Sequence, residues 1–407
     1  MIKKNEMIWN TIGSIIYSLF SAIILVFCTR INGTEIAGMF TIGYATGCIL
    51  NAIGDFGIRI FQVTDVDRKY SFKDYFIARF FAVVIMYIIG LIFVFVSGYR
   101  SEKLFICLVL VTIRIVDNFS ETFQSEFQLN NRLDIAGKVL LIRNTIEILS
   151  FIVVDYITKN IYAAMLAMLL ASIILIFMLD VRKVGCYINW KRKFKVSQVK
   201  KIIIECIPLA LSTLISMYVI NSVKYAIDYY GNNTMQTYFN ILYMPTFAIN
   251  LITLLLIKPF LKPFGECWSK KENGKFIKMI LEIIGVLTVF TIVAELGAFF
   301  LGIPVLNMLY SVDLNIYKID LLVLLFSGLL YAISTVMFYA LGTIRSQKSS
   351  TIAYTITAVF ALIFSNFFVK KMGMHGATIV TVLIMLVLCL LLTIAFAWGF
   401  RKNRNKC

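Results

Sequence analysis

Basic side chains within apolar segments are the residues of this sequence best suited to chemistry. A lysine or arginine at the centre of a membrane-spanning helix costs about 2.5 to 3.5 kcal/mol on insertion scales, so several in one chain indicate a use. Guanidinium binds phosphate well because its planar fork donates two parallel charge-assisted hydrogen bonds. The cationic candidates are Arg30, Arg59, Arg79, Arg114, Arg143, Lys224 and Lys258. They predict a binding site for a phosphate-bearing substrate.

Four of these cations have an acidic residue three or four positions away, close enough to pair on one face of a helix. The expected pairs are Arg59 with Asp55, Arg114 with Asp117, Arg143 with Glu147, and Lys224 with Asp228. Arg30, Arg79 and Lys258 have no such neighbour along the chain, and we expect these three to be available to an external anion. The alternative for Arg79 and Lys258 is an anchoring role, in which the long side chain reaches the lipid headgroups.

Small polar side chains recur at helical spacing in two apolar segments. Asn10, Ser14 and Ser18 follow one face of the first segment. Asn221 and Lys224 belong to a similar stripe in the seventh. Polar groups in lipid need partners inside the protein, so such stripes mark faces turned toward protein or water. We place these residues in the predicted binding cavity; close packing of helices is the alternative explanation for the serines.

Acidic residues of the first half of the chain offer sites for a coupling cation. They are Asp55, Asp117, Glu121 and Glu147, and they lie in or beside apolar segments. Carboxylates at such positions mark ion and proton pathways in membrane proteins. We predict that they bind H⁺ or Na⁺ if an ion gradient drives the protein.

Metal, nucleotide and covalent chemistry find no support in the sequence. The chain has one histidine, His375, and eight cysteines without a C-x-x-C pair, so we expect neither a metal site nor disulfides. The sequence contains no Walker, dinucleotide-binding, zinc-protease or nucleophile-elbow motif. Cations retained in cytoplasmic loops explain the net charge of +17, so no nucleic-acid partner is expected. We predict a protein that is not an enzyme and needs no cofactor.

The elements that must hold these residues are membrane-spanning helices. The chain has 407 residues, of which 60% are hydrophobic and 15% charged, and no water-soluble domain of this size can bury so much apolar surface. A bilayer core about 30 Å thick needs about 20 apolar residues per helix. We identify twelve such segments: 8–29, 37–58, 75–96, 104–123, 139–154, 161–181, 202–223, 238–257, 276–301, 319–341, 352–369 and 377–400. The predicted fold class is therefore all-α integral membrane, with about twelve transmembrane helices.

An internal repeat divides the segments into two sets of six. A shift of 199 residues places Arg59 on Lys258 and Arg79 on Lys278 without a gap. Because six is even, both sets enter the membrane from the same side, and a pseudo-two-fold axis along the membrane normal is expected to relate them. The alternative is coincidence, because cations that anchor cytoplasmic loops also recur at such places.

The repeat predicts a domain organisation with a cleft between two lobes. The parts are an N-terminal six-helix lobe at 1–181, a basic cytoplasmic linker at 182–201, a C-terminal six-helix lobe at 202–400 and a cytoplasmic tail at 401–407. Lysine and arginine gather in the loops on the side of the N-terminus, which predicts that both termini are cytoplasmic. The first segment is too long for a signal peptide and runs into Arg30, so it is expected to remain as a span.

Several stretches combine small, aromatic and basic residues in a distinctive order: WNTIGSIIYSLFSAIILVFCTR, AGMFTIGYATG, IGDFGIRIFQVTDV, ECIPLALSTLISMYVINSVKYAIDYYG, YFNILYMPTFAINL and GMHGATIVTV. They resemble the bacterial polysaccharide flippases, the O-antigen and teichoic-acid repeat-unit branch of the multidrug, oligosaccharidyl-lipid and polysaccharide (MOP) exporter superfamily. The similarity extends over essentially the whole chain, but it is a pattern of small, aromatic and basic residues without a sharp signature.

The resemblance implies two six-helix lobes of the MATE type around a cationic cavity. It implies a flippase of the bacterial cell membrane that moves undecaprenyl-diphosphate-linked oligosaccharides from the cytoplasmic to the outer leaflet by alternating access. The glycans would serve O-antigen, capsule or teichoic-acid synthesis, with a polysaccharide polymerase or assembly proteins as partners. The cavity arginines would bind the diphosphate. Two alternatives stay open: a MATE-like cation-coupled exporter of small molecules and a membrane glycan polymerase.

Overall fold

The computed structural model describes residues 4–65, 68–130, 132–185, 187–188, 194–344 and 346–404. Every regular element in these residues is a helix, so the predicted all-α class is confirmed. The chain forms two compact units, Met1–Met217 and Tyr218–Cys407, which divide within one long helix, α8 (Val196–Tyr230). The lobe boundaries expected from the repeat stay a prediction.

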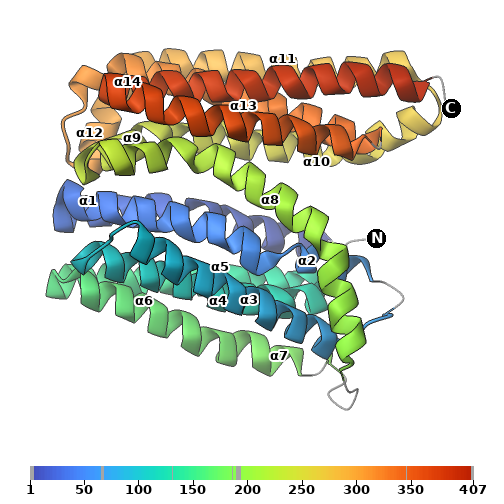
Figure 1. Ribbon diagram of the computed structural model, residues 1–407, viewed down its shortest axis with the longest axis horizontal. Coiled ribbons are helices and arrows are strands. Elements are labelled where there is room, and N and C mark those ends of the chain that lie inside the picture. The colour runs from blue at the N-terminus through green and yellow to red at the C-terminus, as the bar shows by residue number, and fades with distance from the viewer. Residues whose placement is uncertain are drawn as a thin grey trace. The chain divides into compact units, whose positions relative to one another are not determined.

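Unit 1 is a bundle of long helices that lie side by side (Figure 1). Its elements are α1 (Lys4–Asp55), α2 (Ile58–Thr64), α3 (Phe72–Val96), α4 (Ser101–Leu129), α5 (Leu133–Thr158), α6 (Ile161–Leu175), a π-helical turn η1 (Ile176–Val181), α7 (Arg182–Val184) and the first part of α8. Helix α1 packs against α3, α4 and α5, and α6 packs against α4 and α5. This packing surrounds α4 with other helices of the unit.

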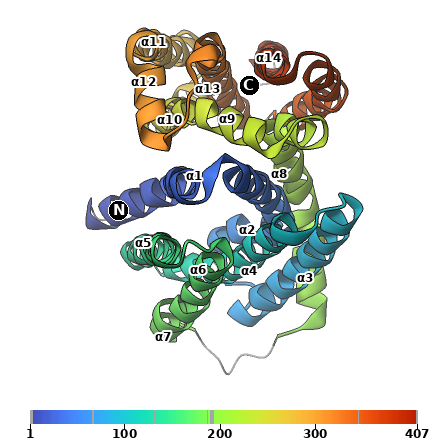
Figure 2. The ribbon, with the colours of Figure 1, turned by 90° about the vertical axis from the view of Figure 1, so that its left-hand side faces the viewer.

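Unit 2 is built in the same way around α13. Its elements are the rest of α8, α9 (Asn233–Tyr243), α10 (Pro245–Ser269), α11 (Asn273–Gly297), η2 (Ala298–Gly302), α12 (Ile303–Tyr310), η3 (Asn315–Tyr317), α13 (Lys318–Thr343) and α14 (Gln347–Arg404). Helix α13 packs against α10, α11 and α14, and Figure 2 shows α11, α13 and α14 grouped together. The segment that contains α13 is the most enclosed of the apolar segments in the described residues.

Two helices are too long to cross a bilayer once. Helix α1 has 52 residues, which at 1.5 Å per residue span about 78 Å against a hydrocarbon core of about 30 Å. A kink at Gly33 (φ 85°, ψ 175°) divides α1, and one at Gly373 (φ 57°, ψ −127°) divides the 58-residue α14. Each of these helices therefore supplies two arms joined by a sharp bend.

Apolar length indicates a multi-pass membrane protein. Among the described residues, eight segments are long and apolar enough to cross a membrane, and two of them contain the kinks of α1 and α14. Helices α4 and α5 are not among the eight, and they carry several buried charged side chains. The expected count of twelve spans stays a prediction.

Capping side chains fix where several helices begin. Ser71 and Asp74 form a capping box at the start of α3, in which the Ser71 amide donates to Asp74 Oδ2 at 2.8 Å. The second carboxylate oxygen of Asp74 accepts from the Lys195 amide at 2.9 Å. Asn160 and Asn232 cap α6 and α9. These caps satisfy amide groups that have no partner within the helix.

Glycine brings α1 and α5 into direct backbone contact. A Cβ atom added at Gly137 would lie 2.4 Å from the backbone nitrogen of Asn10, and one added at Gly13 would lie 2.6 Å from the Gly137 carbonyl oxygen. Small residues permit this close approach, which membrane helices use for packing.

Substituting Gly137 with alanine is expected to destabilise the protein by about 1–3 kcal/mol, because the new methyl group forces α1 and α5 apart. SDS-titrated unfolding of the purified protein measures the effect. Gly285→Ala is the matched control, since a Cβ at Gly285 in α11 meets no atom within 4 Å. Equal stability of the two variants would contradict the tight contact.

Candidate functional site: a buried charge network in unit 1

A cluster of charged and polar side chains lies inside the helical bundle of unit 1. Its members are Asp55, Arg59, Arg79, Arg114, Asp117, Asn118, Ser120, Glu121, Thr122, Arg143, Glu147 and Asp180, and we call it the charge network. They come from α1, α2, α3, α4, α5 and η1. All except Asp55, Arg59 and Glu121 are buried. Helix α4, which lies among the other helices of the unit, contributes six members.

Arg79 of α3 forms the first node of the charge network. Its Nη1 lies 2.9 Å from the Gly54 carbonyl oxygen, 3.0 Å from Asp55 Oδ1 and 2.9 Å from Asn118 Oδ1. Its Nε donates to Thr122 Oγ1 at 3.2 Å. The side chain is 0% exposed. The expectation that Arg79 is available to an external anion is therefore wrong, and a side chain so enclosed does not reach the headgroups either.

The Gly54 carbonyl oxygen can accept a hydrogen bond from Arg79 because it lies at the end of α1. Helix α1 stops at Asp55, and Phe56 and Gly57 adopt positive φ values of 49° and 71° before α2 begins. The last carbonyl groups of a helix have no intrahelical donor, so the Gly54 oxygen accepts from Arg79. Gly57 has a second requirement, because a Cβ there would meet Leu209 Cδ2 at 2.6 Å.

Asp117 is shared by two guanidinium groups in the second node. Arg114 Nη1 donates to Asp117 Oδ2 at 2.8 Å, and Arg143 Nη2 donates to Asp117 Oδ1. Arg143 Nε also lies 3.3 Å from Glu147 Oε1. The guanidinium of Arg114 stacks 4.8 Å from the ring centre of Tyr44. The predicted pairs Arg114–Asp117 and Arg143–Glu147 are confirmed.

Asn118 joins the two nodes. Its Oδ1 accepts from Arg79, while its Nδ2 donates to the Arg114 carbonyl oxygen at 2.7 Å and to Asn51 Oδ1 at 2.8 Å. The amide therefore uses both its acceptor and its donors within the network. Asn118 therefore connects the Arg79 guanidinium to the backbone of Arg114 within α4.

Asp180 is a member that sequence reasoning missed. It lies in the π-helical turn η1, is fully buried, and its Oδ2 accepts from Ser120 Oγ at 3.0 Å. The available signal was its place inside the apolar segment 161–181, because an ionisable residue within a span is a functional candidate by default. Turns of this kind insert one extra residue into a helix and recur at functional sites.

The charge network contains more carboxyl than guanidinium groups. The acidic members are Asp55, Asp117, Glu121, Glu147 and Asp180, and the basic members are Arg59, Arg79, Arg114 and Arg143. Five carboxyl groups against four guanidinium groups leave one negative charge in excess if all are ionised. The charge network itself therefore carries no surplus of cations. An excess carboxylate in a buried site suits a bound cation or a proton.

Several buried atoms of the charge network lack a hydrogen-bond partner among the residues that the structure describes. They are Arg79 Nη2, Arg143 Nε and Nη1, Glu147 Oε1 and Asp180 Oδ1. The 3.3 Å approach of Arg143 Nε to Glu147 Oε1 is thus an ion pair without hydrogen-bond alignment. Unsatisfied buried polar atoms are costly, so these atoms need partners that the described side chains do not supply.

Arg59 pairs differently from the prediction. Its Nη1 lies 3.4 Å from Glu121 Oε1, with the two side chains 41% and 24% exposed. Asp55, the expected partner, pairs with Arg79 instead. The predicted pair of Arg59 with Asp55 is wrong because α1 ends at Asp55, so that Asp55 and Arg59 belong to different helices.

The other predicted cavity residues lie apart from the charge network or belong to unit 2. Arg30 is exposed on α1, Asn10 and Ser14 are partly buried on the same helix, and Ser18 donates to the Ser14 carbonyl oxygen at 2.8 Å. Asn221 and Lys224 are buried in the part of α8 that belongs to unit 2. The side chain of Lys258 lies outside the described residues, and the pairing of Lys224 with Asp228 stays a prediction.

The repeat equates two basic residues whose surroundings differ. Arg79 is enclosed within unit 1, whereas Lys278 in α11 is 76% exposed and lies 4.0 Å from Glu282. Correspondence in sequence therefore does not carry the buried arginine node into unit 2.

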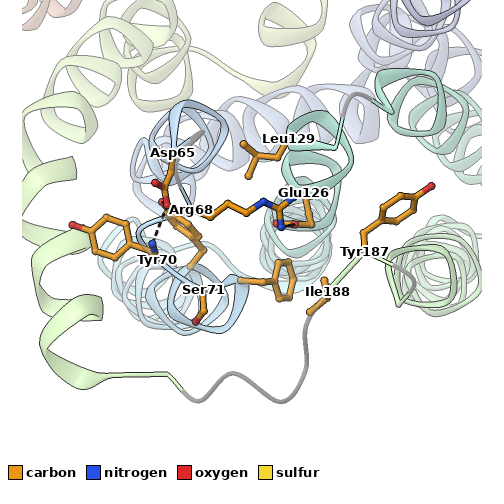
Figure 3. Close-up of a pocket in the computed structure, with 10 residues that line it drawn as sticks. Asp65, Arg68, Tyr70, Ser71, Glu126, Leu129, Tyr187 and Ile188 are labelled. Atoms are coloured by element: carbon orange, nitrogen blue, oxygen red, sulfur yellow. Dashed lines mark hydrogen bonds and ion pairs between the residues drawn. The ribbon is translucent and has the colours of Figure 1, made fainter.

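A polar hollow lies at the ends of α2, α3 and α4 (Figure 3). Its cavity volume is about 60 Å³. Arg68 reaches across it, with Nη1 3.4 Å from Glu126 Oε1 and Nη2 donating to Asn130 Oδ1 at 2.8 Å. Asp65 Oδ2 accepts from the Tyr70 amide at 3.0 Å, and desolvation raises the pKa of the Tyr70 hydroxyl, which therefore stays neutral.

A chain of hydrogen bonds connects this hollow to the charge network. Gln62 Nε2 lies 3.5 Å from Glu126 Oε2 and 3.3 Å from the Thr122 carbonyl oxygen. Thr122 in turn accepts from Arg79 through its hydroxyl group. Thr122 thus contacts both sides, with its backbone oxygen toward Gln62 and its hydroxyl group toward Arg79.

Comparison with known proteins identifies the fold. No protein-family model and no curated protein matches the sequence. Among solved structures, the chain is similar to an inward-facing multidrug resistance MATE family transporter of the MOP superfamily, with 15% identity over 95% of this chain and 94% of that chain and a TM-score of 0.67.

Two further structures extend the comparison. A MATE transporter from Vibrio cholerae in its bent form has 12% identity over 98% and 97% of the two chains, with a TM-score of 0.59. A MOP superfamily transporter from Pyrococcus furiosus with a binding pocket of reverse polarity has 16% identity over 98% and 94%, with a TM-score of 0.57. The chain therefore has the fold of the MATE transporters of the MOP superfamily.

Proposed function

We propose that the protein is a membrane transporter that works by alternating access and is driven by a cation. The observation that carries this proposal is the charge network, which places nine ionisable groups inside one helical bundle of a chain with a transporter fold. Ionisable groups within spans are expensive and typically mark ion pathways. A bundle that only had to be stable would be better served by apolar packing.

The coupling cation, H⁺ or Na⁺, is proposed to bind at the carboxylate end of the charge network. Of the predicted coupling residues Asp55, Asp117, Glu121 and Glu147, the last is favoured, because its Oε1 is buried without a hydrogen bond in the described structure. Asp180 joins this set, since its Oδ1 is in the same condition. Binding there neutralises the excess negative charge of the network.

The proposed cargo is an undecaprenyl-diphosphate-linked oligosaccharide, moved to the outer leaflet of a bacterial cell membrane for cell-surface polysaccharide synthesis. Its support is the resemblance of the sequence to polysaccharide flippases along the whole chain. Both termini would then be cytoplasmic, and a polysaccharide polymerase would act on the product. Transport of this kind needs no covalent chemistry.

The geometry changes which arginine should meet the diphosphate. Arg79, Arg114 and Arg143 are buried in ion pairs and would have to break them. Arg59 is the most exposed arginine of the charge network, and its one ion pair among the described residues is the long one to Glu121. A phosphate oxygen can replace that carboxylate and gain a bidentate contact. We therefore assign the first contact with the diphosphate to Arg59.

Replacing Arg59 with alanine is expected to slow translocation of a lipid-linked oligosaccharide about 10- to 100-fold, the value of one charge-assisted contact. The assay is a liposome in which a membrane-impermeant enzyme modifies the glycan that has reached the far leaflet. Arg132→Ala is the matched control, because Arg132 is 43% exposed and pairs with Asp134 at 3.0 Å, much as Arg59 pairs with Glu121. Equal rates for the two variants would remove Arg59 from the substrate site.

A second candidate function is export of small cationic molecules. The excess of carboxyl groups in the charge network favours it, since an acidic site attracts cations. The same liposomes decide between the two cargoes when they are loaded with a fluorescent cationic dye. Efflux of dye along an imposed pH or Na⁺ gradient, without movement of the glycan lipid, would favour the exporter.

A further inference from the structure

An apolar groove on unit 2 contains a carboxyl group. The groove has a cavity volume of about 540 Å³ and is formed by α11, η2, α13 and α14. Seven of its eight lining side chains are apolar, and the eighth is that of Glu295. Four of the apolar ones, Ile292, Leu296, Phe299 and Phe326, are exposed. The groove is therefore open to the hydrocarbon of a bilayer, and Glu295 is the exception within it.

Helix α11 places Glu295 at the level of lipid headgroups. Lys275 precedes Glu295 by 20 residues in the same helix, which corresponds to about 30 Å, the thickness of the hydrocarbon core. Lys275 and Lys278 are exposed, as lysines at the headgroups of one leaflet are. Glu295 therefore lies at the headgroup level of the opposite leaflet, which is the outer one in the predicted orientation.

A positive charge lies at the same end of the groove. Lys318 is the first residue of α13, which packs against α11. Its Nζ lies 3.8 Å from the ring centre of Phe299, a lining residue four positions after Glu295. Among the residues that the structure describes, neither Glu295 nor Lys318 forms an ion pair. The groove thus ends in one carboxyl and one ammonium group that do not neutralise each other.

The π-helical turn η2 joins two walls of the groove. Phe299 belongs to this turn, which continues α11 directly. A Cβ atom added at Gly302 would lie 2.7 Å from Leu321 Cδ2, so glycine lets the turn pack closely on α13. Turns of this kind recur at functional sites.

We propose that this groove binds one phospholipid of the phosphatidylethanolamine class. A carboxylate among apolar groups is unfavourable without a positive partner, and an ammonium group that stacks on a ring still has donors for an acceptor. The zwitterionic headgroup supplies both partners, its phosphate to Lys318 and its ammonium to Glu295. One acyl chain then lies along the apolar lining. The site goes beyond the proposed function, because a bound bilayer lipid does not require transport.

The two charges select ethanolamine among phospholipid headgroups. Phosphatidylglycerol has no cation for Glu295 and would bring a second negative charge near it. Phosphatidylcholine has a cation, but its quaternary nitrogen has no N–H group and cannot form the charge-assisted hydrogen bond that a primary ammonium donates to a carboxylate. A groove that only held acyl chains would not distinguish these three lipids.

Native mass spectrometry tests this selectivity on protein extracted from vesicles of equal parts phosphatidylethanolamine, phosphatidylglycerol and phosphatidylcholine with identical acyl chains. The ratio of retained phosphatidylethanolamine to each of the other lipids is expected to be about tenfold higher in the wild type than in Glu295→Gln, the value of one charge-assisted hydrogen bond. Glu282→Gln is the matched control, because Glu282 lies on the same helix outside the groove and is 55% exposed. Equal ratios in the wild type and Glu295→Gln would overturn the proposal.

A second variant tests the groove while keeping both charged groups. Val382→Trp fills part of the cavity and is expected to reduce the retained phosphatidylethanolamine about tenfold, because the indole takes the space of the acyl chain. Val305→Trp is the control, since Val305 is exposed in α12 and does not line the groove. Unchanged retention in Val382→Trp would overturn the proposal. So would a dimer that Val382→Trp dissociates without any effect on lipid, because the occupant would then be a second copy of the chain. Neither measurement involves transport, so both leave the proposed cargo and coupling untouched.

Discussion

Replacing Arg143 with methionine is expected to destabilise the protein by about 3–5 kcal/mol, the usual cost of removing one partner from a buried ion pair. Arg143 is the cation that Asp117 and Glu147 share, and both carboxylates are buried with it. Methionine fills much of the space of the arginine stem but leaves these charges facing each other. SDS-titrated unfolding of the purified protein measures the loss.

A double variant separates lost charge balance from lost packing. Adding Glu147→Gln to Arg143→Met removes one uncompensated carboxylate, and we expect at least a third of the lost stability to return, since charge pairs in contact are strongly non-additive. Lys278→Met is the control, because that lysine is exposed and pairs with Glu282 only at 4.0 Å, a kind of pair that contributes little. If the double variant is less stable than Arg143→Met alone, the balance of charge does not govern this node.

Arg79→Lys is expected to destabilise the protein although the substitution keeps the positive charge. Arg79 uses Nη1 and Nε to reach Asp55, Asn118 and Thr122 together with the Gly54 oxygen. A lysine ammonium is a single point charge and cannot cover acceptors spread around a planar fork. We expect a loss of about 1–3 kcal/mol for Arg79→Lys, since buried acceptors stay unpaired, and about 3–5 kcal/mol for Arg79→Met.

The same variants distinguish a structural node from a substrate ligand. A residue that only bound diphosphate would tolerate replacement without loss of stability and would lose transport alone. Arg132→Lys serves as the control, because Arg132 is partly exposed and its replacement leaves no acceptor buried. Unchanged unfolding of Arg79→Lys and Arg79→Met, combined with lost translocation, would restore Arg79 to the cavity where the sequence analysis placed it.

The outcome for the arginines shows how far local spacing predicts a membrane interior. Arg114 with Asp117 and Arg143 with Glu147 were predictable, because each pair lies on one helix at a distance of three or four residues. Arg79 was mispredicted because its partners come from α1 and α4, at positions that only the packing of helices brings near. The absence of an acidic residue nearby in sequence therefore does not show whether neighbouring helices supply a partner for a buried arginine.

Composition predicts the fold class, but it does not predict which helix lies at the centre of unit 1. Composition and apolar length are enough to predict an all-helical membrane protein, because only helices and closed barrels satisfy the backbone in lipid. Helix α4 shows the limit: its buried charged and polar side chains make it less apolar than a typical span, yet it lies at the centre of unit 1. The buried polar residues that weaken such a segment as a span prediction are also the ones that build the charge network.

The break between α1 and α2 makes electrostatics and backbone geometry inseparable. Arg79 Nη1 donates both to the Asp55 carboxylate and to the Gly54 carbonyl oxygen at the end of α1. A cation that replaced the guanidinium at Asp55 would also remove the hydrogen bond to the Gly54 carbonyl oxygen. Phe56 and Gly57, which have positive φ values, follow directly in the chain. The Asp55 carboxylate and the end of α1 beside this left-handed pair therefore depend on the same guanidinium nitrogen for their position.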